Sequence, residues 1–91
     1  MKIKLSGNLA RFVDYQRELD IELPGELTVN AAIEQLVNAY PGLHDVIYDK
    51  QGDIKKGYLI AYNGKKLEPN QRDQPVNAQG CIDLFTAVAG G

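Results

Sequence analysis

Residues 28–42 read TVNAAIEQLVNAYPG, and this stretch decides the fold of the 91-residue chain. It predicts a helix from about Val29 to Tyr40, with Thr28 as its N-cap and Pro41-Gly42 as its stop. The apolar residues recur at the spacing of one helical face, namely Ala32, Ile33, Leu36, Val37 and Tyr40. Any sheet in this chain therefore has one main helix available to cover it.

Two alternating runs precede the helix and predict a pair of antiparallel strands. Residues 1–6 place Met1, Ile3 and Leu5 on one face and two lysines on the other. A bend at Gly7-Asn8 is expected to follow. A second alternating run covers residues 15–23 before a Pro-Gly pair ends it.

Three predicted strands follow the helix. Residues 58–62 and 65–67 flank Asn63-Gly64, the strongest hairpin signal in the chain. Residues 81–89 form a long final strand, in which Ile82 and Leu84 are expected to face the helix. The strand at 58–62 is apolar on both faces, so its inward face cannot be assigned from alternation.

The connecting segments have weaker patterns. Residues 43–48 are expected to add a short second helix. Residues 49–57 are polar and are interpreted as a mobile surface loop, and residues 68–80, which contain two prolines, as a connection.

The order strand, strand, helix, strand, short strand, long strand predicts an α+β fold. The economical arrangement is a mixed sheet of four to five strands curled around the one main helix, with the first and last strands parallel at its centre. This is the β-grasp, or ubiquitin-like, architecture. A single domain over residues 1–91 is expected, because a chain of this length accommodates one core.

Composition narrows the functional classes. The chain is 44% hydrophobic and 24% charged, and it has no apolar run near the roughly 20 residues that cross a bilayer. A net charge of −2 with scattered basic residues argues against nucleic acid as a partner. The first residues alternate and do not resemble a signal peptide, so a cytoplasmic protein is expected. We also expect no membrane partner and a monomer when the protein is free.

No residue pattern points to chemistry performed by this chain's own side chains. The only histidine, His44, has no cysteine or paired carboxylates nearby, so no metal site is expected. Asp45, Asp49 and Asp53 lack the glycine and glutamate of a calcium loop. Cys81 is interpreted as a packed thiol. No nucleophile and base pair is visible, so we expect no catalytic residue and no bound cofactor.

The end of the sequence is its most informative functional feature. Gly90 and Gly91 follow directly on the predicted last strand. Because glycine has no Cβ, two in succession can enter a channel too narrow for side chains. We expect a flexible tail over residues 87–91 that presents the Gly91 carboxylate to another protein; before Gly91 it comprises Ala87, Val88, Ala89 and Gly90.

The element order, the Tyr62-Asn63-Gly64 turn and the ending Ala87-Val88-Ala89-Gly90-Gly91 together resemble the ubiquitin-like sulfur carriers of the MoaD/ThiS family. The resemblance covers the whole chain. It implies that an E1-like enzyme of the MoeB/ThiF type adenylates Gly91 with ATP, which the partner binds. It further implies conversion to a thiocarboxylate, with a sulfide or persulfide enzyme as sulfur donor and a downstream synthase as acceptor.

The tail sequence bears on the pathway. The small subunit of molybdopterin synthase usually has a proline pair shortly before Gly-Gly, where this chain has Thr86-Ala87. The ending is more similar to carriers that supply sulfur for cysteine or other amino-acid biosynthesis. A molybdopterin synthase subunit is kept as an alternative.

Phe85 is the predicted partner-binding residue. It shares a strand face with Asp83, which should face water, so an exposed aromatic is expected beside the reactive tail. Aromatic anchors dominate many protein interfaces.

Two alternatives of another class remain open. In one, a ubiquitin-like module binds proteins through its sheet and the tail has no chemistry. In the other, Gly91 is joined to lysine side chains, as in a protein modifier. The same tail serves both a carrier and a modifier, so the sequence does not separate them.

Overall fold

The main helix forms where the sequence predicts it. The structure is a computed structural model, and it describes residues 1–5, 7–13, 16, 18–22, 25 and 27–86. Helix α1 (Val29–Ala39) begins at the predicted N-cap, where the Ala31 backbone N–H donates to Thr28 Oγ1 at 3.1 Å. The buried face of α1 consists of Val29, Ala32, Ile33, Leu36 and Val37. Four of these five were predicted, and Tyr40 caps the C-terminal end instead of belonging to the helix.

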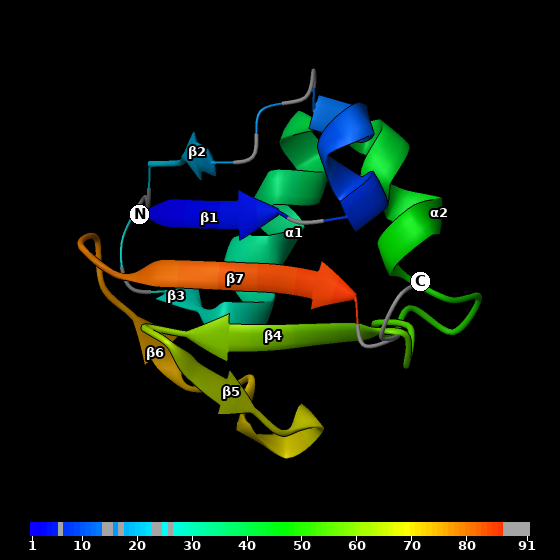
Figure 1. Cartoon of the computed structure of the whole chain (residues 1–91). Helices are drawn as coiled ribbons and strands as arrows, with labels where there is room; N and C mark the ends of the chain where they lie inside the picture. Colours follow the sequence, from blue (N-terminus) through cyan, green and yellow to red (C-terminus); the bar gives the residue numbers. More distant parts are fainter. Residues whose placement is uncertain (6, 14–15, 17, 23–24, 26, 87–91) are drawn as a thin grey trace.

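A five-stranded mixed sheet packs against α1 and has the order β2-β1-β7-β4-β5 (Figure 1). Strands β1 and β7 run parallel at its centre, and every other pair in this sheet is antiparallel. The strand bounds are β1 (Lys2–Leu5), β2 (Glu18–Asp20), β4 (Tyr58–Tyr62), β5 (Lys65–Leu67) and β7 (Cys81–Thr86). The predicted α+β, β-grasp arrangement is confirmed.

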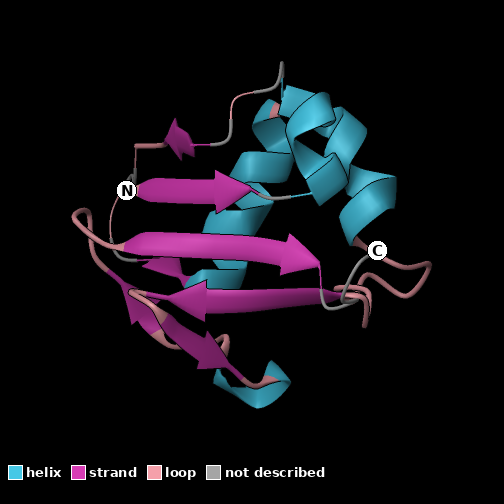
Figure 2. Ribbon diagram, viewed as in Figure 1, coloured by secondary structure: helices cyan, strands magenta, loops and turns pink. Residues whose placement is uncertain are grey.

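The core lies between the sheet and the helices that cover one of its faces (Figure 2). Central strands contribute alternate side chains to it, because neighbouring residues of a strand point to opposite faces. Ile60, Ile82 and Leu84 are fully buried, as are Leu36 and Ile33 on α1. The inward orientation predicted for Ile82 and Leu84 is confirmed.

The expected bend at Gly7-Asn8 is wrong, because the chain forms the 3-10 helix η1 (Gly7–Val13) there. Leu9 and Val13 from this helix are fully buried, so they anchor the segment in the core. The second strand is also shorter than predicted: β2 spans three residues of the expected run 15–23. Ile21 and Glu22 continue the alternation but lie outside the strand, so alternation alone does not mark where a strand ends.

Residues 68–80 are more ordered than the predicted connection. They contain the 3-10 helix η3 (Pro69–Gln71) and strand β6 (Pro75–Val76). Strand β6 pairs with β3 (Leu27–Thr28), just before α1, in a separate two-stranded sheet. This pairing joins segments far apart in the sequence, so no local sequence pattern predicts it.

Two other segments agree with the sequence. The short second helix predicted at 43–48 is present as the 3-10 helix η2 (Pro41–Leu43) followed by α2 (His44–Ile47). The final strand is described as far as Thr86, and its predicted continuation to Ala89 lies outside the described residues.

The β4–β5 hairpin is tied to the start of β7. Asn63 and Gly64 have positive φ angles of 51° and 85°, as expected for the predicted Asn-Gly turn. The Cys81 backbone N–H donates to Asn63 Oδ1 at 2.9 Å, and the Asn63 N–H donates to the Cys81 carbonyl at 2.8 Å. Gly80 precedes Cys81 in the chain, and a Cβ on Gly80 would lie 2.6 Å from the Tyr62 hydroxyl.

We expect Gly80→Ala to destabilise the protein by about 1–3 kcal/mol, because the added methyl overlaps the Tyr62 ring. Urea unfolding measures the change. Gly57→Ala is the matched control, because a Cβ there meets nothing within 4 Å, and it should change stability by less than about 0.5 kcal/mol. Equal effects of the two substitutions would contradict the close approach at Gly80.

Candidate functional site

Strand β7 presents its second face away from α1. Cys81, Asp83 and Phe85 lie on this outer face and are partly exposed, while Ile82 and Leu84 between them are fully buried. The predicted outward orientation of Phe85 is therefore correct, although its ring is partly rather than fully exposed. Phe85 is the last residue but one of β7 and lies close to the start of the predicted tail.

Leu59 on β4 completes an apolar pair with Phe85. The two residues are direct partners in the antiparallel β4–β7 ladder, and both are partly exposed. Side chains of such partners are close enough to contact each other. The sequence did not single out Leu59, because the strand at 58–62 is apolar on both faces. The register of β4 against β7 was the missing signal.

Charged residues lie on both sides of this pair on the outer face. On β1, Lys2 forms an exposed salt bridge with Glu18 of β2 at 2.9 Å. That hydrogen bond raises the pKa of Lys2 and lowers the pKa of Glu18. On the other side, exposed Lys66 of β5 is opposite Ala61 of β4. The Leu59–Phe85 pair is therefore an apolar centre flanked by charges, the general layout of a protein-binding surface.

Cys81 also lies on the outer face, and its surroundings suppress its reactivity. Burial raises the pKa of its thiol, and the negative charge of Asp83 raises it further. Because the thiolate is the nucleophilic form, a raised pKa lowers reactivity at neutral pH. The prediction of an unreactive thiol agrees with this direction, although the side chain faces outward rather than into the core.

The other polar candidates have structural surroundings. His44 is exposed, with Nδ1 3.0 Å from Asp45 Oδ1. Asp49 Oδ1 accepts from the backbone N–H groups of Gln51 and Asp53, which organises the turn between them. Among the residues that the structure describes, no three His, Cys, Asp or Glu side chains gather to hold a metal.

The predicted reactive residue, Gly91, lies outside the described residues, as do Ala87, Val88, Ala89 and Gly90. The structure describes the chain as far as Thr86, which pairs with Tyr58 at the beginning of β4. The Leu59–Phe85 pair is the next rung of the same ladder. The described part of the candidate site is thus the end of β7 and its outer face.

The sequence matches the ThiS family over residues 3–91. The chain belongs to the ThiS family. It is 29% identical over 91 residues to small archaeal modifier protein 1 of Haloferax volcanii, with 100% of each chain covered. A crystal structure of that protein superposes with a TM-score of 0.86 and 26% identity, covering 100% of this chain and 98% of the other.

A more distant structure shares the fold. It is described as the BexX/CysO complex of Amycolatopsis orientalis, with a TM-score of 0.77, 16% identity and coverage of 99% of this chain and 98% of the other. This ThiS-family chain is thus a member of a group of small ubiquitin-like sulfur carriers and modifiers, as the sequence predicted. Within the described ranges, no helix is long and apolar enough to span a membrane.

We expect the rate at which iodoacetamide alkylates Cys81 to rise with pH around a pKa above that of an ordinary cysteine, because burial and Asp83 both disfavour the thiolate. Asp83→Asn should lower this pKa and speed alkylation at neutral pH. Asp20→Asn, on the same outer side of the sheet, is the control and should have little effect. An Asp83→Asn variant that titrates like the parent would rule out the assigned cause.

Proposed function

We propose that this ThiS-family chain is a sulfur carrier whose terminal Gly91 carboxylate becomes a thiocarboxylate. The observation that supports it is the pair Gly90-Gly91 at the end of a sequence that matches the family from residue 3 to residue 91. In a chain ending there, the reactive group is the main-chain carboxylate, and glycines impose no side chain on the enzyme that receives it.

The chemistry has two balanced steps. A Gly91 carboxylate oxygen attacks the α-phosphorus of ATP, pyrophosphate leaves, and an acyl adenylate forms. Sulfide then attacks the carbonyl carbon, and the bond from that carbon to the AMP oxygen breaks. AMP is released, and Gly91 ends in a thiocarboxylate. Adenylation is needed because a free carboxylate is anionic and resonance-stabilised, and so resists nucleophiles.

The partner supplies ATP and the catalytic groups in this proposal. It is an E1-like adenylating enzyme of the MoeB/ThiF type, which acts with a sulfide or persulfide donor and a sulfur-accepting synthase. This chain acts as a co-substrate in the cytoplasm, monomeric when free. The ending Ala-Val-Ala-Gly-Gly favours an acceptor in cysteine or homocysteine synthesis over a role as molybdopterin synthase small subunit.

Protein modification is the second candidate function. The relative with 29% identity is named a modifier protein. A lysine amine that attacks the same acyl adenylate, or a thioester derived from it, would give an isopeptide bond in place of a thiocarboxylate. The two functions therefore share the first step and differ in the nucleophile.

The decisive test is the intact mass of the protein after incubation with ATP, the E1-like enzyme of the same organism and sulfide. We expect a gain equal to the replacement of one oxygen by one sulfur. A variant without Gly91 is the control and should show no gain. An unchanged mass, with the enzyme active on another carrier, would contradict the carrier function. Linkage of Gly91 to lysines in cell extracts would favour the modifier.

We further propose that Phe85 and Leu59 together anchor the adenylating enzyme. Phe85→Ala and Leu59→Ala should each raise the Michaelis constant for the carrier about tenfold or more, because truncating an aromatic or central apolar anchor commonly costs about 2 kcal/mol. Measurements of pyrophosphate release give this constant. Arg11→Gln, an exposed residue on η1, should change it little. The anchor would be excluded by a Phe85→Ala carrier that keeps the parent Michaelis constant.

A further inference from the structure

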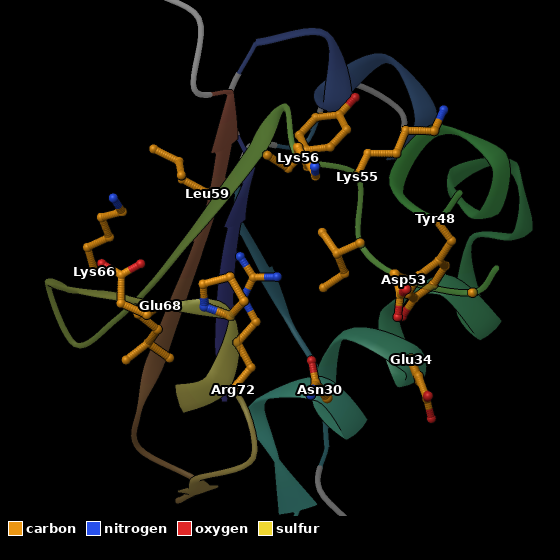
Figure 3. A pocket seen from close by; sticks show the side chains of 15 residues that line it. Asn30, Glu34, Tyr48, Asp53, Lys55, Lys56, Leu59, Lys66, Glu68 and Arg72 are labelled. Atoms are coloured by element: carbon orange, nitrogen blue, oxygen red, sulfur yellow. The ribbon is translucent and has the colours of Figure 1, made fainter. Parts of the chain in front are cut away.

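A hollow of about 600 Å³ lies between α1 and the β4–β5 edge of the sheet (Figure 3). Its walls come from α1, the segment 52–56, strands β4 and β5, and η3 with the residue that follows it. The volume lies in the range of roughly 300–1,000 Å³ typical of ligand sites. Much of the lining is apolar or aromatic and comprises Tyr48, Ile54, Tyr58, Leu67 and Pro69.

Arg72 is the central polar group of the hollow. Its Nε is buried and has no hydrogen-bond partner in the described part of the chain. Its backbone carbonyl accepts from the Asn30 N–H at 3.0 Å, which fixes the residue against the first turn of α1. Figure 3 shows its side chain extending into the middle of the hollow. A buried donor without a partner is unfavourable, so a carboxylate that approaches the Arg72 guanidinium offsets part of this cost.

The charge of Arg72 persists in this position. Burial lowers the pKa of its guanidinium, and the nearby Glu68 carboxylate opposes this change. An arginine remains protonated in proteins because its unperturbed pKa is so high. The hollow therefore holds a partly desolvated positive charge with an unused donor.

Several other charged side chains of the lining point away from the hollow, and the basic and acidic groups of the lining nearly cancel. Lys55 Nζ donates to the Asp45 carbonyl at 2.7 Å, outside the hollow. The Lys66 and Glu34 side chains lie at its edges and point outward (Figure 3). In total the lining carries four basic side chains and three carboxylates. This near balance suits one negative charge placed on Arg72 and disfavours a dianion.

The hollow reaches the end of β7. Tyr58, which lines it, is the ladder partner of Thr86 at the end of β7. Leu59 lines it too and is the partner of Phe85 on the outer face. A protein that contacts the Leu59–Phe85 pair therefore comes close to the rim of the hollow at Leu59.

We propose that the hollow receives an acidic side chain, aspartate or glutamate, from the protein that handles the tail, and that Arg72 binds its carboxylate. The identity of that protein rests on the proposed function; the carboxylate site itself does not. A guanidinium matches a carboxylate in shape and charge, and its planar fork can donate two hydrogen bonds to it. The apolar walls suit the methylene groups that carry the carboxylate.

The site can be tested on the isolated protein by NMR of the arginine Nε–H groups. We expect the Arg72 signal to shift saturably on titration with the peptide Ac-Ala-Glu-Ala-NH₂. The matched peptide Ac-Ala-Gln-Ala-NH₂ should produce no saturable shift. Arg11, which is exposed beside Phe12, is an internal control for nonspecific attraction. No shift at Arg72, or an equal shift at Arg11, would overturn the proposal.

Partner binding gives a second readout. Arg72→Gln should raise the Michaelis constant of the adenylating enzyme for the carrier about tenfold, because it removes a charge-assisted hydrogen bond. Arg72→Lys should restore part of the loss, and Arg11→Gln should have no effect. If the parent chain is not adenylated at all, the proposed function fails, while the peptide titration still decides the site. An unchanged constant in Arg72→Gln would overturn the partner's role.

The protein's own tail is the competing occupant. A variant that lacks Gly90 and Gly91 places its terminal carboxylate elsewhere, so the Arg72 Nε–H signal of the free protein should stay unchanged if the site is reserved for a partner. A large shift on this deletion would show that the tail had occupied the hollow. If the glutamate peptide also binds the shortened variant more tightly, because it no longer competes with the tail, the hollow belongs to the tail and the proposal is overturned.

Discussion

The parallel pairing of β1 with β7 over helix α1 is the constraint on which the rest of the structure depends. In this ladder Ile3 is the partner of Ile82, and Leu5 is the partner of Leu84, and all four are buried. A shift of one residue would turn the opposite side chains toward the helix and place Asp83 in the core, where an unpaired carboxylate is costly. The register thus fixes Phe85 on the outer face at the end of β7.

The end of β7 is also where two different surfaces meet. Leu59 belongs to both, because it is the ladder partner of Phe85 and also lines the hollow around Arg72. One surface is an apolar pair on the outer face, and the other is a single guanidinium in a partly apolar pocket. An apolar contact supplies binding energy without direction, whereas a guanidinium–carboxylate pair requires one orientation. Together they can fix how a partner sits relative to the tail.

Local signals carried most of the fold and little of the site. Helix α1, the Asn63-Gly64 hairpin and the inward face of β7 follow from spacing and turn chemistry within a few residues. The segment around Leu9 and the pairing of β6 with β3 depend on contacts between distant parts of the chain, so they were missed. Arg72 was hidden for the same reason. It lies in a polar stretch that reads as a connection, and only its packing against α1 makes it a buried donor.

A carrier and a modifier present the same chemical group to their activating enzyme, since both reactions begin from an acyl adenylate of a terminal glycine. The tail therefore contributes nothing to the choice between sulfide and amine as nucleophile. That choice must therefore depend on which proteins bind the folded domain. A domain discriminates between two partners through features that bind one and reject the other. A partly buried guanidinium does so, because a partner that covers Arg72 without a carboxylate removes water from its charge and offers no partner in return. The hollow is thus better suited than the tail to separate one ubiquitin-like pathway from another.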